Sequence, residues 1–153
     1  MASAFPDLTP FVHPQRVLFF DGMPSKRDAL LRMIDLLVRA PEVGNGPAYA
    51  QAIFDREDVT STGIGGGVAV PHAQLPSVTA FTIAIGVCRQ GIDFAAKDAR
   101  PVRVVVMIAA PTSDRPAYLK ILASVAARLN RPMLVAHMIE AGDSNAAIAA
   151  FLG

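Results

Sequence analysis

The residues with the clearest chemical potential lie in one stretch, 61–73, which reads STGIGGGVAVPHA. A cluster of glycines precedes a short apolar run that ends in Pro71 and His72. Proline fixes its own φ and favours an extended residue before it, so the imidazole leaves the strand in a defined direction. A neutral imidazole keeps a lone pair on one nitrogen when an acceptor holds its other N–H. His72 is therefore a candidate nucleophile for a phosphoryl group, and the alternative is a hydrogen-bonded histidine that only lines a loop.

These glycines do not belong to the common nucleotide or hydrolase motifs. A P-loop requires Gly-Lys-Ser/Thr, and the chain has no lysine between Lys26 and Lys97. A dinucleotide fingerprint opens a helix, whereas these glycines lead into a predicted strand, and G-x-S-x-G is absent. The three histidines (His13, His72 and His137) lack the spacing of metal ligands. We therefore expect no metal and no cofactor.

The composition of the chain excludes further classes of protein. The 153 residues suffice for one compact domain, and a hydrophobic content of 52% argues against extended disorder. A net charge of +1 gives no electrostatic basis for binding nucleic acid or an anionic membrane surface. No apolar stretch reaches the roughly 18–20 residues of a membrane span. Because the N-terminus does not resemble a signal peptide and Cys88 is the single cysteine, we expect a cytoplasmic protein without membrane insertion.

The elements that position His72 follow from periodicity and turn signals. Ser25 can cap a helix, and apolar residues recur after it at helical spacing. The run 101–110 is nearly all apolar and β-branched, which is typical of a central strand covered on both faces. The predicted order is an irregular segment (1–15), an edge strand (16–20), a helix (25–40), a helix from Pro47, strands at 68–70, 79–88 and 101–110, and helices at 116–130, 132–142 and 144–152. This order predicts one α/β domain with a covered sheet.

One stretch resembles the signature of a known domain family, namely residues 55–73, which read DREDVTSTGIGGGVAVPHA. The family is the type-2 IIA domain (EIIA type-2) of the bacterial phosphoenolpyruvate:sugar phosphotransferase system, or PTS. It has fructose, mannitol and nitrogen-regulatory members. The matching positions are Arg56-Glu57, Thr62-Gly63-Ile64-Gly65 and Gly67-Val68-Ala69-Val70-Pro71-His72. Residues 91–111 and 118–129 are similar to the family's following strand and helix, and the opening helix with Lys26 also fits. The resemblance covers residues 16–152 and assigns 16–153 to an EIIA type-2 domain.

The resemblance implies a mixed β-sheet flanked by helices and a chemistry centred on His72. In this family the histidine takes a phosphoryl group from HPr, or from its nitrogen-branch counterpart, and passes it to a IIB domain or regulates an effector. Arg56 matches the family's arginine near that histidine, and its guanidinium can meet two phosphoryl oxygens. Leu75 is expected on the apolar docking face around His72. The choice between sugar transport and nitrogen regulation stays open, as does a weak homodimer.

One position departs from the family pattern. Many members carry a second histidine beside the active one, where this chain has Tyr118. A phenol donates a hydrogen bond to phosphate but carries no positive charge. Losing a charge-assisted bond costs about 1.5–3 kcal/mol, or roughly one to two decades in rate. Tyr118 thus leaves an alternative function open, a IIA-like regulatory binding module that is not phosphorylated.

The remaining polar residues receive simpler assignments. Thr62 either offers its hydroxyl to the phosphate or starts the turn. Glu57 is expected to be a capping or solvated carboxylate, Cys88 a core residue and His137 half-exposed. Asp98 is expected to terminate the turn KDARP. The buried stripe of the 116–130 helix is expected to comprise Leu119, Leu122, Val125, Ala126 and Leu129.

Overall fold

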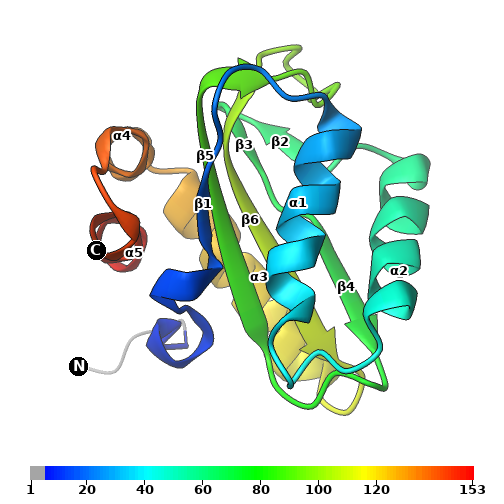
Figure 1. Ribbon diagram of the computed structural model, residues 1–153. Helices are drawn as coiled ribbons and strands as arrows, with labels where there is room; N and C mark the ends of the chain where they lie inside the picture. Colours follow the sequence, from blue (N-terminus) through cyan, green and yellow to red (C-terminus); the bar gives the residue numbers. More distant parts are fainter. Residues whose placement is uncertain (1–5) are drawn as a thin grey trace.

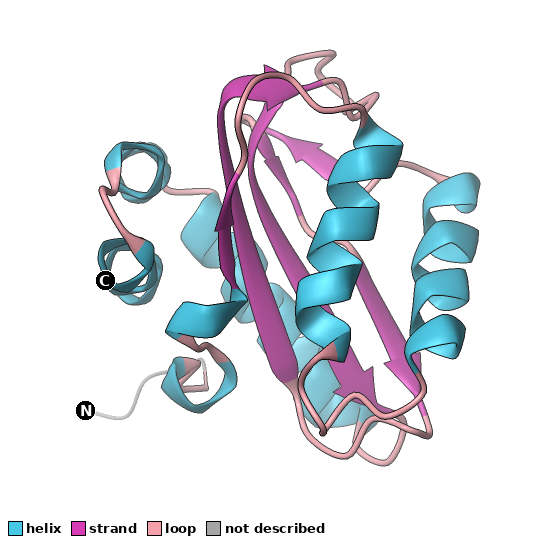
Figure 2. Ribbon diagram, viewed as in Figure 1, coloured by secondary structure: helices cyan, strands magenta, loops and turns pink. Residues whose placement is uncertain are grey.

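Two long apolar strands form the centre of the fold. In the computed structural model, which describes residues 6–153, β5 (Thr82–Ile92) and β6 (Val102–Pro111) pair antiparallel, with Ile85 opposite Val106. Every residue of β6 except Arg103 is buried, because helices cover both faces of the sheet (Figures 1 and 2). The central, doubly covered strand predicted from the apolar run is confirmed.

The sheet has six strands, and its mixed character is confirmed. At one edge β1 (Val17–Phe19) runs parallel to β5, as predicted for an edge strand. On the other side β3 (Val68–Ala69) and β4 (His72–Leu75) both run parallel to β6, and β2 (Gly63–Gly65) pairs antiparallel with β3. The strands β2 and β4 were not predicted, because neither the glycines nor the residues after His72 show the alternation of a strand.

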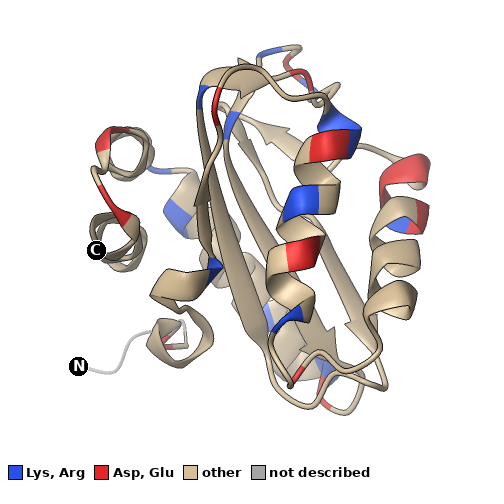
Figure 3. Ribbon diagram, viewed as in Figure 1, with Lys and Arg blue, Asp and Glu red and all other residues tan. Residues whose placement is uncertain are grey.

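Helices form a layer on each face of the sheet. The first face carries α1 (Lys26–Val38) and α2 (Gly46–Val59), and the second carries α3 (Arg115–Leu129), α4 (Pro132–Glu140) and α5 (Ser144–Leu152) (Figures 1 and 2). Four helices begin at a polar side chain that accepts a backbone N–H, namely Ser25, Asn45, Asp114 and Asp143. Acidic and basic residues are interspersed along α1 and at the end of α2 (Figure 3). None of the helices in residues 6–153 is long and apolar enough to span a bilayer.

The alternation of side chains along the strands divides the core in two. On β5, Ile83, Ile85 and Val87 pack toward the α3–α5 layer, whereas Ala84 and Cys88 pack toward α1 and α2. Cys88 is buried, as predicted. Each face of the sheet therefore has its own apolar core.

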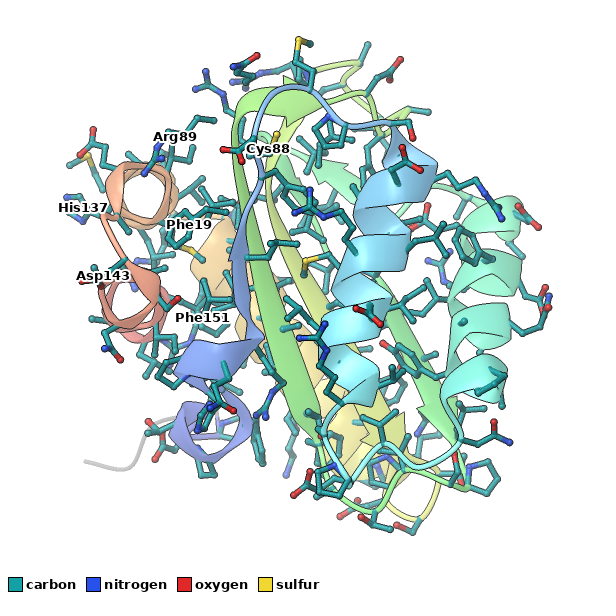
Figure 4. The ribbon with its side chains drawn as sticks, in the orientation of Figure 1. Phe19, Cys88, Arg89, His137, Asp143 and Phe151 are labelled. Carbon is teal, nitrogen blue, oxygen red and sulfur yellow. The ribbon has the colours of Figure 1, made fainter. Side chains whose placement is uncertain are left out.

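The described N-terminal segment and the last helix are in contact on the second face. The N-terminal part that the structure describes holds two short 3₁₀ turns, Thr9–Phe11 and Pro14–Arg16, and the first five residues of the predicted irregular segment lie outside the described residues. Arg89 donates to the carbonyls of Ile139 (2.9 Å) and Ala141 (2.7 Å) at the end of α4. Figure 4 shows Arg89, Phe19 and the buried Phe151 between the sheet and the last two helices, with His137 on the outer side of α4. His137 is exposed.

The buried stripe of α3 differs from the prediction. Tyr118, Ile121, Val125 and Leu129 face the core, but Leu119 is 51% exposed. The prediction for Leu119 was wrong because α3 carries apolar residues on two adjacent stripes. Packing against the sheet, rather than hydrophobicity, determines which stripe is buried. The second stripe, with Leu122 and Ala126, is only half-buried.

Gly86 is the point of closest approach between β5 and α1. A Cβ added there would lie 2.7 Å from Met33 Sδ and 3.0 Å from Phe20 Cε2. We expect Gly86→Val to lower the free energy of unfolding by about 1–3 kcal/mol, because the added side chain overpacks this core. Urea unfolding measures the change.

A matched control is Gly142→Ala, since no atom lies within 4 Å of the position that a Cβ would take there. This control should change the free energy of unfolding by less than about 0.5 kcal/mol. Equal effects of the two variants would contradict the expected overpacking.

Candidate active site

His72 lies where one strand is interrupted beside β6. Ala69 of β3 is opposite Val105 and His72 of β4 is opposite Ile108, so both strands follow the same register along β6. Between them, the Pro71 carbonyl accepts from Ile108 N (2.9 Å), and Val70 N donates away from β6 to the Thr62 carbonyl (3.0 Å). The register therefore continues through the break at Pro71, and the N–H of Val70 is bonded on the β2 side rather than to β6.

The Val70 carbonyl determines the tautomer of His72. Its Nδ1 lies 2.7 Å from the Val70 carbonyl oxygen. A carbonyl only accepts, so Nδ1 carries the proton and donates, and Nε2 keeps its lone pair. Burial lowers the pKa of His72 below its ordinary value of 6.5; the hydrogen bond to Val70 opposes this shift, Arg56 adds to it and Glu57 opposes it. The imidazole is therefore neutral and nucleophilic at physiological pH.

His72 opens into a cavity of about 220 Å³. Segments far apart in the chain line this cavity. They are the end of α2 and the residues that follow it (Arg56, Thr60, Ser61, Thr62 and Ile64), the residues around Pro71 (Val70 and His72), the β5–β6 connection (Lys97) and α3 (Leu122 and Ala126). His72 itself is half-buried. The imidazole is thus reachable from solvent and shares its cavity with two cationic side chains.

Arg56 is held at this cavity by its own helix end. One guanidinium nitrogen, Nη1, donates to the Thr60 carbonyl at 2.9 Å. This bond orients the planar guanidinium and leaves its other N–H groups for a ligand. In residues 6–153 Arg56 forms no ion pair with a carboxylate. The arrangement suits an anion placed between the guanidinium and the imidazole.

Glu57, by contrast, points away from solvent. Its side chain is 5% exposed and pairs with Lys26 of α1, Nζ to Oε2, at 2.7 Å. Lys26 also donates to the Phe94 carbonyl (3.2 Å), which accepts from Ser61 Oγ as well (2.7 Å). The expectation of a solvated or capping carboxylate was wrong. Glu57 instead ties α1, the end of α2 and the β5–β6 connection together at one end of the sheet (Figure 1).

Thr62 belongs to the same network. Its backbone N–H and its hydroxyl both donate to the Glu57 carboxylate, and the residue is buried. Since the hydroxyl is engaged, this geometry favours a role in starting the turn over a bond to phosphate. Thr62 still lines the cavity and holds its floor in place.

Tyr118 packs against His72 from α3. The two ring centroids are 6.2 Å apart with planes tilted by 58°. Burial raises the pKa of Tyr118, and the charges of Arg115 and Arg56 partly offset the rise, so the phenol is neutral at physiological pH. The wall that α3 presents to His72 is therefore aromatic and uncharged.

Leu75 differs from expectation, whereas Asp98 is confirmed in its turn and makes one further bond. Leu75 packs, partly buried, against the core under α1 and α2, and is thus not beside His72. His72 and Gln74 alternate with Leu75 along β4, so they face the other side of the sheet. Asp98 does close its turn, accepting from Arg100 N (3.1 Å), but it also accepts from Gly66 N (2.9 Å). This second bond fastens the β5–β6 connection to the glycine turn.

Sequence reasoning missed Lys97 altogether. It lies in the connection FAAKDARP, where a single lysine looks like an ordinary solvated residue. Only the folded chain brings it to the His72 cavity. No group of three or more potential metal-ligating side chains gathers within residues 6–153.

The protonation of His72 can be tested directly. Because burial and Arg56 lower its pKa, His72 should stay neutral as the pH falls from 7.5 to about 6.5 and should titrate only below the ordinary value. Nitrogen-15 NMR should show the proton on Nδ1. In Arg56→Gln the midpoint should move up, since a positive neighbour is removed. A midpoint above 6.5, or a proton on Nε2, would contradict this assignment.

The Lys26–Glu57 pair gives a prediction on stability. In Lys26→Met the buried carboxylate loses its partner, and we expect a loss of about 3 kcal/mol, at the low end for a broken buried pair because Lys26 is 27% exposed. The double variant Lys26→Met/Glu57→Gln should recover part of this loss, since no charge stays unpaired. Urea unfolding at pH 7 compares the variants. A single variant within about 0.5 kcal/mol of wild type would show that the pair contributes little.

Comparison with known proteins identifies the family of this chain. The family model described as "Phosphoenolpyruvate-dependent sugar phosphotransferase system, EIIA 2" matches residues 11–152. A fructose-specific EIIABC component of the PTS from Bacillus subtilis is 34% identical over 81% of this chain, which corresponds to only 20% of that protein's length. A nitrogen regulatory protein from Bradyrhizobium diazoefficiens is 32% identical over 92% of this chain and 91% of its own.

Solved structures share the fold. The nitrogen regulatory protein IIA-Ntr from Neisseria meningitidis superposes with a TM-score of 0.86 at 22% identity, covering 95% of this chain and 99% of that one. The enzyme IIA-mannitol from Escherichia coli, in its complex with phosphorylated IIB-mannitol, gives 0.77 at 20% identity, covering 92% and 96%. Since the family model spans nearly the whole sequence, this chain belongs to the EIIA type-2 family of the phosphoenolpyruvate-dependent sugar phosphotransferase system.

Proposed function

We propose that this chain is a phosphoryl carrier that uses His72 as its acceptor. The observation that carries the proposal is the hydrogen bond from Nδ1 to the Val70 carbonyl, which leaves the lone pair on Nε2 of an imidazole that lines the same cavity as Arg56. Membership of a family of phosphotransferase components supports the same role. The donor is HPr or its nitrogen-branch counterpart, and the recipient is a IIB domain or a regulatory effector.

The chemistry needs no cofactor. The Nε2 lone pair forms a new N–P bond, while the N–P bond of the donor's phosphohistidine breaks and its electron pair returns to the donor nitrogen. The Nδ1 proton stays in its hydrogen bond, and the Val70 carbonyl stabilises the positive charge that develops on the ring. Phosphoryl transfer depends mainly on alignment and on charge stabilisation of the oxygens, which Arg56 is placed to give.

Tyr118 takes a secondary role in this proposal. Its ring holds the imidazole on one side, and its neutral phenol is a hydrogen-bond donor for a phosphoryl oxygen. Thr62 acts indirectly, through its bonds to Glu57, by holding the α2–β2 connection on which the cavity is built.

The docking face lies around this cavity. Ile64 is 45% exposed beside it, and Leu119 extends the Leu122 and Ala126 stripe of α3 outward. This apolar surface replaces the one expected around Leu75. The complex of IIA-mannitol with phosphorylated IIB-mannitol supports a IIB partner for this chain. Transient phosphotransfer contacts need only a modest area of this kind.

The proposal is tested by incubation with phosphoenolpyruvate, enzyme I and either HPr or its nitrogen-branch counterpart. Intact mass spectrometry should show the addition of one phosphoryl group, labile in acid as a phosphoramidate is. His72→Ala should abolish the addition. His13→Ala and His137→Ala are matched controls, because neither histidine lines the cavity, and both variants should be phosphorylated like wild type.

The opposite result has a defined meaning. If neither carrier phosphorylates the wild-type chain, the alternative of a non-phosphorylated regulatory binding module is favoured, and the neutral Tyr118 is the observation that supports it. Phosphorylation that persists in His72→Ala would refute the assignment of the acceptor.

A further inference from the structure

We propose that Lys97 is a second cationic residue of the transfer site, whose ammonium binds the oxygens of the phosphoryl group as it moves onto His72. This inference rests on the proposed function. Lys97 lines the same cavity as His72 and Arg56, although it comes from the β5–β6 connection, 25 residues beyond His72 in the chain.

The charge of Lys97 is not neutralised by the protein. The ion pairs within residues 6–153 are Lys26–Glu57 and Arg39–Asp35, and neither includes Lys97. The neighbouring carboxylate, Asp98, is turned to the backbone N–H groups of Gly66 and Arg100. An unpaired ammonium beside a neutral nucleophile favours a dianionic ligand.

The backbone on both sides of Lys97 is held in place. The Phe94 carbonyl accepts from Ser61 and from Lys26, and Phe94 is buried. Ala96 packs so closely on Gly63 that a Cβ added to the glycine would lie 2.8 Å from the Cβ of Ala96. On the other side Asp98 binds Gly66 N at 2.9 Å. The lysine is thus attached to the rim of the His72 cavity at residues before and after it.

This connection also adopts an unfavourable conformation. Ala95 (φ 52°) and Ala99 (φ 59°) flank Lys97 in the left-handed region, which residues with a side chain rarely occupy. Such residues persist where the surrounding contacts impose them, and they gather at functional sites. Here the two left-handed alanines bracket Lys97, the residue of this connection that lines the cavity.

The charges of the site explain what Lys97 adds. During the transfer the phosphoryl oxygens carry negative charge. At that moment phosphorus is only partly bonded to the donor nitrogen and to Nε2 of His72. Arg56 supplies one cation from α2, and α3 supplies none, because Leu122 and Ala126 line the cavity and Tyr118 beside His72 is neutral. Lys97 supplies the second positive charge from the opposite connection. As before, the Nε2 lone pair forms the N–P bond, the donor nitrogen keeps the electron pair of the broken bond, and Lys97 exchanges no proton.

The test compares initial rates of His72 phosphorylation for Lys97→Met, Lys97→Arg and wild type. One donor is the phosphorylated HPr-type carrier, and the other is inorganic phosphoramidate, which has no protein surface to dock. Loss of the charge-assisted contact should slow Lys97→Met about 10–100-fold with both donors. With the carrier, the maximal rate should fall while the half-saturating carrier concentration changes little. Lys97→Arg keeps the charge and should retain most of the rate.

Lys120→Met is the matched control. Lys120 is exposed and lies two residues from Leu122 on α3, hence on the far side of the helix from the cavity. It should behave like wild type with both donors. A rate for Lys97→Met within about twofold of wild type with phosphoramidate would overturn the proposal, even if the carrier reaction is slowed, because Lys97 would then act in docking. Failure of the wild-type chain to be phosphorylated by any donor would instead count against the proposed function.

Discussion

The site depends on one hydrogen bond, from His72 Nδ1 to the Val70 carbonyl. Val70 alternates with residues that face β6, and its N–H is bonded to Thr62 on the β2 side, so its carbonyl is not part of the ladder with β6. Proline has no N–H to place in the ladder, yet its carbonyl still accepts from Ile108, so the interruption does not shift the register. The nitrogen of His72 that keeps its lone pair is thus selected by backbone geometry.

Charge is arranged around this nitrogen by separating cations from carboxylates. Glu57 follows Arg56 in the chain, but its carboxylate is turned inward to Lys26 and Thr62. Asp98 follows Lys97 and is turned to backbone N–H groups. A buried carboxylate is tolerated only when it is paired and hydrogen-bonded, and both conditions are met for Glu57. The cavity therefore holds positive charge that the protein does not cancel.

The layers of the fold explain why the site lies at this edge. The apolar strands β5 and β6 carry a core on each face, and the site occupies the side of β6 where the short strands β2, β3 and β4 leave room between the end of α2 and α3. A histidine in the centre of the sheet would be covered by helices. At this edge His72 is fixed by the sheet and still reachable from solvent.

Local patterns in the sequence were sufficient to predict much of the fold and part of the site. The Ser25 cap, the apolar run of β6 and the short strand that leads to Pro71-His72 were predicted correctly because each depends on residues close in the chain. The stripe on α3 was partly wrong, since Tyr118 and Leu119 are neighbours that could each be buried and only contact with the sheet distinguishes them. Likewise Glu57 could not be recognised as buried, because its partner Lys26 lies 31 residues before it.

What the sequence by itself determined is the family, the order of most elements and the identity of the candidate acceptor, all carried by short-range motifs. Only the tertiary structure decided the protonated nitrogen of His72, the inward direction of Glu57 and the arrival of Lys97 at the cavity. The physical reason is that a tautomer, a buried charge and a shared cavity are set by the atoms that surround a group, and those atoms come from segments far apart along the chain.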